Sequence, residues 1–302
     1  MSARTGRLGA TRIVGELLLT VGAVLLLFLF YEAFWSNLDS RRLQNEAAAG
    51  LEQRWSNGPA AEAADDADDA AGIADKSAGP ATRAPGGEPV PPAVPALGEA
   101  FARIHLPTLG DDAVYAVVEG VRAEDLRTGP GHYPGTQMPG EAGNAALAGH
   151  RNGSGAVFER LDRLTSCDAI IIETATQWLT YRLLPVEVGG AERLAAAQDC
   201  LTPQQSERIA TGDYAHVRGA HITTPEAVEV IAPVPGHKGG AGAAGAAEET
   251  GATGGADGAA LERLLTLTTC HPMYSNAERL IVHAVLTETT AKADGRPAAL
   301  ED

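Results

Sequence analysis

Three side chains in this 302-residue sequence could together carry out acyl transfer: the thiol of Cys270, the imidazole of His150 and the guanidinium of Arg279. A thiolate can attack a peptide carbonyl and form a thioester, and an imidazole can give a proton to the departing amine. A guanidinium can donate two parallel hydrogen bonds to the oxyanion that develops in between. We therefore predict cysteine-dependent acyl transfer, provided that the fold brings the three side chains together.

The runs around these residues indicate β-strands that end at or begin near the three side chains. Cys270 ends the alternating run LLTLTTC, Arg279 precedes the run LIVHAVL, and His150 ends the apolar run ALAGH. Side chains alternate between the two faces of a strand, so Thr268 and Cys270 share one face and Thr269 lies on the other. If the two later strands pair side by side, they bring the thiol and the guanidinium within reach of one substrate atom.

Each of these side chains also has an ordinary structural interpretation. Free cysteine is often a small core residue, a Gly-His pair often only ends a strand, and an exposed arginine is usually solvated. We favour the catalytic interpretation because the three occur together and because Cys270 ends its strand beside polar residues. His271 adjoins the thiol, but neighbours on a strand point to opposite faces, so we do not expect it to be the acid.

The motifs resemble those of the sortases, membrane-anchored cysteine transpeptidases of Gram-positive cell surfaces. The family's TLxTC motif, its following arginine and its upstream Gly-His occur here as TLTTC ending at Cys270, then Arg279, with Gly149-His150 upstream. Pro272, the string AGHR and the segment GPGHYPGT at 129–136 are similar to the actinobacterial class E branch. The resemblance covers roughly residues 101–286. It implies a mostly β fold, an eight-stranded closed β-barrel with few helices.

The resemblance also implies a reaction and a set of partners. Cys270 would cleave a LAxTG or LPxTG sorting signal between Thr and Gly and hold the surface protein as a thioester. An amine on a peptidoglycan precursor would then accept the acyl group, and no cofactor is needed. Tyr133, Thr268 and Thr269 would line the substrate groove, and the tyrosine would favour LAxTG.

Other functions stay open on the residues alone. A sortase that joins pilin subunits through a lysine would use the same chemistry, and a catalytically silent sortase-like protein would bind sorting signals or act as a scaffold. An L,D-transpeptidase would want a SHGC-like motif, which TTCHP lacks. The net charge of −16 argues against a nucleic-acid partner. The scattered acidic residues near the barrel do not indicate a metal site.

Composition divides the chain into five segments. We expect a cytoplasmic tail at 1–12, a transmembrane anchor at 13–35, a disordered Ala/Asp/Pro-rich linker at 36–98, the catalytic domain at 99–290 and a tail at 291–302. Within the linker, residues up to about Trp55 could instead prolong the helix of the anchor. As a helix, the 23 residues of the anchor would span about 34 Å, enough for a bilayer core of about 30 Å. A cleavable signal peptide is the alternative, but no small-x-small site follows promptly. The arginines before the anchor favour a cytoplasmic N-terminus and a catalytic domain outside the cell membrane.

Short strands with turns between them are expected through the catalytic domain, which favours a closed barrel or a sandwich. Helices are expected at 155–164 and 191–209 and a further strand at 226–233. An insertion at about 189–222 and a disordered Gly/Ala-rich loop at 239–260 interrupt the pattern. Cys167 and Cys200 could form a disulfide that ties the insertion to the core, a pairing that the sequence leaves open.

The protonation states of the two reacting groups constrain the mechanism. With reference pKa values of about 8.5 for a thiol and about 6.5 for an imidazole, a few per cent of Cys270 is thiolate near pH 7 and about a quarter of His150 is protonated. If the two titrate independently, roughly one molecule in a hundred has both groups in the reactive form. We expect the enzyme to work from this minority state.

Overall fold

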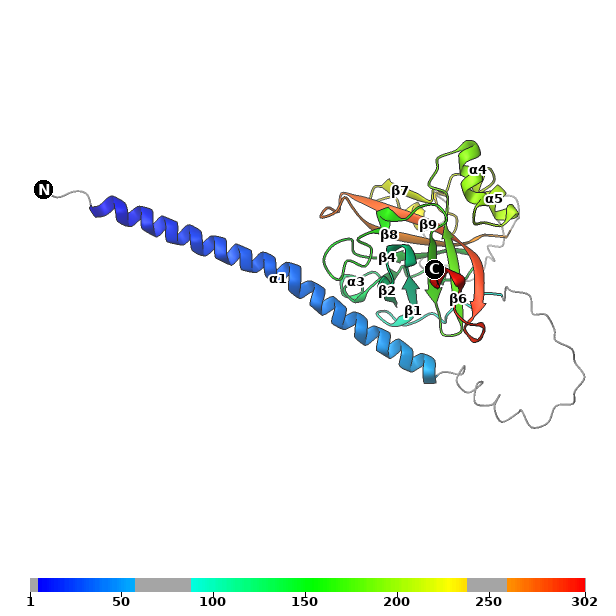
Figure 1. The fold of residues 1–302 in the computed structure, drawn as a ribbon, viewed down its shortest axis with the longest axis horizontal. Coiled ribbons are helices and arrows are strands. Elements are labelled where there is room, and N and C mark those ends of the chain that lie inside the picture. The colour runs from blue at the N-terminus through cyan, green and yellow to red at the C-terminus, as the bar shows by residue number, and fades with distance from the viewer. Residues whose placement is uncertain (1–4, 58–87, 238–259, 302) are drawn as a thin grey trace, which may run out of the picture.

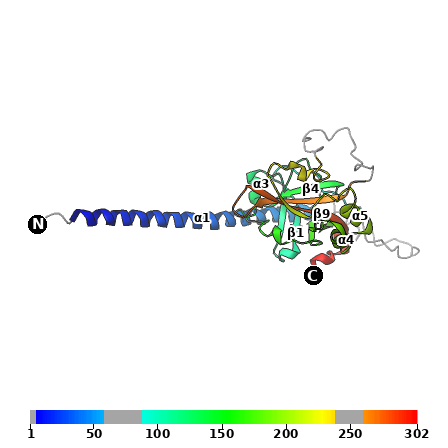
Figure 2. The same ribbon diagram turned by 90° about the horizontal axis from the view of Figure 1, so that it is seen from above.

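The computed structural model describes residues 5–57, 88–237 and 260–301 (Figure 1). A long N-terminal helix, α1 (Thr5–Asn57), lies beside a domain built mainly of β-strands. The view at right angles shows the C-terminal part of α1 against this domain and the N-terminal half extending away from it (Figure 2). Most of the predicted linker, residues 58–87, and nearly all of the predicted Gly/Ala-rich loop lie outside the described residues.

Eight strands close into a barrel, which confirms the predicted fold class. β9 pairs with β8 along its first part and with β6 along its second part, and this closes the sheet. A short additional strand, β7 (Ala220–Thr223), pairs with the first part of β9. The order around the barrel is β6 (Gln177–Leu183), β5 (Ala169–Glu173), β1 (Ala100–His105), β2 (Val114–Glu119), β3 (Gly131–His132), β4 (Gly143–Ala148), β8 (Arg263–His271) and β9 (Glu278–Ala291).

Apolar side chains that alternate along the strands fill the barrel interior. Ile104, Leu147, Leu265 and Leu267 are among those with no exposed surface. Because Leu265 and Leu267 point inward, the side chains between them in β8 point outward, and so does Cys270. The thiol therefore lies on the outer face of the barrel, where a peptide can reach it.

The predicted insertion folds against the outside of the barrel. It forms α4 (Gly190–Gln198) and α5 (Pro203–Ala210) and ends in β7. Its apolar side chains pack a second core with Leu264 of β8 and Val285 of β9. Arg193 of α4 is only 2% exposed, and its guanidinium donates to four backbone carbonyls, which offsets the cost of burying its charge.

A disulfide joins Cys167, just before β5, to Cys200, just after α4. The two Cα atoms are 5.7 Å apart, and the residues are separated by 33 positions in the sequence. The bond ties the insertion to the barrel, which settles the pairing that the sequence left open.

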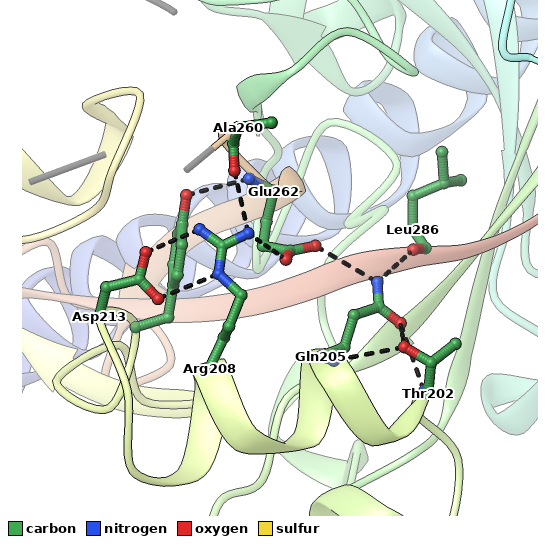
Figure 3. Close-up of polar contacts among 8 residues, drawn as sticks. Thr202, Gln205, Arg208, Asp213, Ala260, Glu262 and Leu286 are labelled. Atoms are coloured by element: carbon green, nitrogen blue, oxygen red, sulfur yellow. Dashed lines mark hydrogen bonds and ion pairs between the residues drawn. The ribbon is translucent and has the colours of Figure 1, made fainter. Parts of the chain in front are cut away.

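Polar contacts fasten α5 to the beginning of β8 (Figure 3). Arg208 donates from Nε and Nη2 to the two carboxylate oxygens of Asp213, at 3.0 and 2.7 Å, and from Nη1 to Glu262 at 2.6 Å. The backbone N–H of Glu262 donates to the Tyr214 hydroxyl at 3.0 Å. Glu262 directly precedes β8, so these contacts fix the strand that ends at Cys270.

Three expectations from the sequence are wrong in part. The linker predicted at 36–98 begins later than expected: residues 36–57 continue α1, in line with the alternative of a helix prolonged to about Trp55, because the stretch lacks proline, contains good helix formers and packs against the barrel. The expected helix at 155–164 is mostly turns with the 3-10 helix η3 (Leu161–Arg163), since Ser154 and Ala156 have left-handed backbone angles. The expected strand at 226–233 contains the 3-10 helix η4 (Val228–Ile231).

The side chain of Asn144 explains the last difference. Its amide donates to the backbone carbonyls of Val230 and Ala232, at 3.3 and 3.0 Å, so this segment bonds to a side chain rather than to a strand edge. The remaining short helices are α3 (Ala123–Thr128), η2 (Pro107–Leu109), η5 (Lys292–Asp294) and η6 (Ala298–Leu300). Among the helices that the structure describes, none has the length and apolar character needed to cross a membrane.

Candidate active site

The register of β8 and β9 places Cys270 directly opposite Arg279. Directly opposed residues in an antiparallel pair have Cβ atoms about 4.5–5.5 Å apart and point to the same face. Both side chains are partly exposed on the outer face. The expected pairing of the two strands, with Cys270 and Arg279 in register, is therefore confirmed.

β4 brings His150 to the same end of the sheet. β4 runs parallel to β8, and its last residue, Ala148, lies beside Thr268. Beyond β4 the backbone N–H of Gly149 donates to the Thr268 carbonyl at 3.1 Å, so the pairing continues past the strand end. His150 and Cys270 lie two positions after Ala148 and Thr268, respectively. The three predicted residues thus come from three adjacent strands and gather at one end of them.

Burial lowers the pKa of His150 below its ordinary value of 6.5. Desolvation disfavours the imidazolium, so at pH 7 less of His150 is protonated than the quarter expected from the sequence.

Backbone carbonyls orient the guanidinium of Arg279. Its Nη1 donates to the carbonyls of Asn276, at 3.0 Å, and Glu278, at 2.9 Å. Nε and Nη2 carry the three other N–H groups of the guanidinium. These groups remain to donate hydrogen bonds to a substrate oxyanion. The backbone at the start of β9 thus holds the guanidinium of a residue that lies in register with Cys270.

His271 is held on the other side of β8, as its position in the strand predicts. Nη1 of Arg151 lies 2.7 Å from Nδ1 of His271, and Nη2 donates to Asp162 at 2.8 Å. Because a guanidinium only donates, Nδ1 of His271 accepts this hydrogen bond. An imidazole that accepts from a buried cation is unsuited to carry a proton to the leaving amine.

Comparison with known proteins agrees with this geometry. The sequence profile of the sortase domain matches residues 104–287, which is more than half of the chain. The chain belongs to the sortase family.

Its relatives indicate the E-like class. Sortase SrtE1 of Streptomyces coelicolor is 27% identical over 299 residues, covering 96% of this chain and 61% of the relative, so the chain spans less than two thirds of that protein. Sortase SrtE2 of the same organism is 25% identical over 97% of this chain and 88% of its own length. The solved structure of the SrtF sortase from Corynebacterium diphtheriae is 49% identical, with a TM-score of 0.61 over 71% of this chain and all of that one.

Tyr133, Thr268 and Thr269 were expected to line the substrate groove, and the structure places Tyr133 and Thr268 together but Thr269 apart from them. The Tyr133 hydroxyl lies 2.9 Å from the Thr268 hydroxyl, next to the strand end that carries the thiol. Thr269 is 3% exposed, and its hydroxyl donates to the Gly149 carbonyl at 2.8 Å. Thr269 therefore fixes the backbone before His150 rather than lining the groove, because it points to the opposite face from Cys270.

His132 explains why the segment around Tyr133 is ordered. Its Nδ1 lies 2.7 Å from a Glu119 carboxylate oxygen and its Nε2 lies 2.9 Å from the Thr136 hydroxyl, and the ring is 1% exposed. His132 ends β3, and these contacts of its ring hold the turn that follows Tyr133 against the barrel.

The sequence interpretation missed two residues of β7. Thr223 lies opposite Arg279, and His221 lies opposite Ile281. Both residues of β7 therefore lie on the outer face of the barrel, which Cys270 shares. Cys270, Arg279 and Thr223 therefore lie in register across β8, β9 and β7, and His150 follows the end of the next strand, β4. The only signal for β7 is the short alternation His221-Ile222-Thr223, which is too brief to recognise without its partner strand. In the part of the chain that the structure describes, no three His, Cys, Asp or Glu side chains are grouped to hold a metal ion.

Proposed function

We propose that this sortase cleaves a sorting signal on a surface protein and transfers that protein to an amine of the cell wall. The observation that carries the proposal is the register that aligns Cys270 with Arg279 and continues the β4–β8 pairing to His150. Each residue has the role that its chemistry allows: nucleophile, proton donor and oxyanion-binding cation.

The reaction has two halves that balance. The Cys270 thiolate attacks the carbonyl carbon of Thr in the signal, and Arg279 stabilises the oxyanion. As the C–N bond to Gly breaks, the leaving amine takes the proton from His150, and a thioester remains. An incoming amine then attacks the thioester, His150 takes a proton from it, and the thiolate leaves.

The surroundings of Tyr133 support a preference for LAxTG over LPxTG. Its hydroxyl lies beside Thr268, which shares the outer face with Cys270 two positions away. A peptide whose Thr carbonyl lies at the thiol would extend along this face, with its preceding residues near Tyr133. In class E sortases, which this chain resembles, a tyrosine in this segment is linked to the same preference.

We further propose that the protein works at the outer surface of the cell membrane. The disulfide between Cys167 and Cys200 supports an oxidising, extracytoplasmic location. Large apolar side chains in the N-terminal half of α1, such as Leu17, Leu19 and Leu26, are exposed and form a surface suited to lipid. The turn between β8 and β9 extends toward the side on which that half of α1 lies (Figures 1 and 2). Separation of membrane and soluble fractions, followed by protease treatment of intact cells, tests this; recovery of the protein in the soluble fraction, or protection of the barrel from protease in intact cells, contradicts it.

Peptide cleavage tests the proposed reaction. The full-length protein in detergent is incubated with LAxTG and LPxTG peptides, with and without a glycine amine, and products are separated and weighed. We expect cleavage between Thr and Gly, amine-dependent transfer, and a higher kcat/KM for LAxTG. Tyr133→Phe, which removes only the hydroxyl, is expected to reduce the difference between the two peptides. Binding of peptide without any cleavage would favour the silent scaffold instead.

A further inference from the structure

The loop that follows His150 is closed by a hydrogen bond to the backbone of this histidine. Residues 151–157 leave His150 and return to Phe158, whose backbone N–H donates to the His150 carbonyl at 3.0 Å. Within the loop the N–H of Ala156 donates to the Gly153 carbonyl at 2.8 Å. A shift of this loop therefore moves the backbone that carries the imidazole.

The loop is not a conformation that its residues adopt readily. Ser154 and Ala156 have φ angles of 43° and 44°, in the left-handed region that favours glycine. Such a backbone conformation is unfavourable for a residue with a Cβ and persists only when surrounding structure holds it. Something outside the loop must therefore stabilise it.

α1 supplies that support. The N–H of Gly155, between the two strained residues, donates to Oδ1 of Asn37 at 3.1 Å. Ser40, one turn along α1, is 3% exposed, and a Cβ on Gly155 would lie 3.3 Å from the Ser40 Cβ. The glycine thus allows close approach, and the tip of the loop rests on the helix.

Contacts further along α1 hold the helix against the barrel. The Gln44 side chain accepts from the Ala116 N–H at 2.8 Å and donates to the Ala116 carbonyl at 3.0 Å, so it bonds to β2 as a neighbouring strand would. Leu51 is 1% exposed. Near the helix end the ammonium of Lys292 lies 3.9 Å from the centre of the Trp55 ring. The docked surface therefore runs from Asn37 to Trp55.

We propose that residues 37–57 of α1 are a positioning element of the active site, which holds the 151–157 loop and, through it, His150. This rests on the proposed function, since it assigns the helix a part in the same reaction. Asn37 is the positioning residue that contacts the loop, and Gln44 keeps the helix in place. The helix thereby takes part in catalysis without touching substrate.

Two pairs of nearly isosteric substitutions in the full-length protein test the proposal. Gln44→Glu puts an oxygen against the carbonyls of Ala116 and Thr128, and Gln53→Glu makes the same change at an exposed position of the same helix. Asn37→Leu removes the acceptor for Gly155, whereas Asn37→Asp retains it. We expect Gln44→Glu and Asn37→Leu to lower kcat roughly tenfold with KM changed less than twofold, because a small misplacement of a catalytic group acts on the chemical step. Gln53→Glu and Asn37→Asp should match the wild type.

Thermal unfolding, with the assay at least 10 °C below every midpoint, separates positioning from stability. A purely structural helix would lower the midpoint and leave kcat unchanged. Wild-type values of kcat in both Gln44→Glu and Asn37→Leu overturn the proposal. Absence of any turnover in the wild type would instead overturn the proposed function, so the two failures are distinguishable.

Discussion

Cys270 and Arg279 face each other across β8 and β9 as a directly opposed pair. The register places the proposed nucleophile and a guanidinium at the same end of two paired strands. The bonds from Arg279 to the carbonyls of Asn276 and Glu278 orient the guanidinium before substrate arrives. Such preorganised charge is effective because it needs no rearrangement during the reaction.

Arg279→Lys is expected to lower kcat/KM about 100-fold, although the charge is kept. The ammonium of lysine lacks the planar set of N–H donors that a guanidinium has. It cannot donate hydrogen bonds to the carbonyls of Asn276 and Glu278 and, at the same time, two parallel hydrogen bonds to an oxyanion. The measurement is steady-state cleavage of the preferred peptide, and Arg163→Lys at an exposed position serves as the matched control. A loss of less than threefold would show that Arg279 does not bind the oxyanion.

The pH profile of kcat/KM is expected to be bell-shaped with its lower limb below pH 6.5. The reactive state has His150 protonated and Cys270 ionised, so the lower limb reports the imidazole and the upper limb reports the thiol. Burial lowers the pKa of His150, which moves the lower limb toward acid. A lower limb at or above pH 6.5 would contradict this environment for His150.

Glu173 is expected to make the barrel less stable in acid. Burial by itself would raise its pKa, but hydrogen bonds from His105 and Lys292 and the charge of Arg103 lower it to about 2. A carboxyl with a lowered pKa stabilises the fold above its unfolded pKa, about 4.5, and loses this contribution as the pH falls toward 2. A shift of this size corresponds to about 3 kcal/mol at neutral pH.

Denaturant unfolding from pH 7 to pH 2.5 checks this contribution. Glu173→Gln should be less stable than the wild type at pH 7, and the difference should shrink below pH 4.5. Glu288→Gln on exposed β9 surface should show no such pH-dependent difference. A constant difference across the range would mean that Glu173 is not held in its charged form.

Removing the disulfide is expected to destabilise the domain by about 3–4 kcal/mol, given the 33-residue separation of Cys167 and Cys200. The variant with serine at both positions leaves the Cys270 strand intact, so its kcat should be unchanged at temperatures where it is folded. Chemical unfolding with and without reductant measures the effect on the wild type. An intact mass that does not rise by two daltons on reduction would show that the bond is absent.

Alternation along the short strands predicts a barrel or a sandwich and the direction of Cys270, whereas the closed eight-stranded barrel was predicted from the resemblance to the sortases. Leu265 and Leu267 alternate with outward side chains, which fixes the direction of Cys270, and the motifs mark where each strand ends. The helical continuation of α1 over 36–57 could be anticipated from composition, but its docking could not. The bonds between Gln44 and Ala116 join residues 72 positions apart, and no periodic pattern encodes them.

The position of Thr223 beside Arg279 and the hydrogen-bond partner of Thr269 could not be predicted from the sequence. β7 has four residues and is a strand only because β9 offers it an edge. Thr269 was expected in the groove through its place in the motif, whereas strand alternation sends its hydroxyl to the Gly149 carbonyl. In both cases the partner that decides the role lies on a distant segment.

The intact mass of the full-length protein after mixing with a LAxTG peptide tests the central claim most directly. We predict an added acyl mass on Cys270 that disappears when a glycine amine is supplied and never forms in Cys270→Ala. Cleavage of the peptide that persists in Cys270→Ala, or a folded wild type that forms no adduct with either LAxTG or LPxTG peptide, would contradict a thioester mechanism at this cysteine.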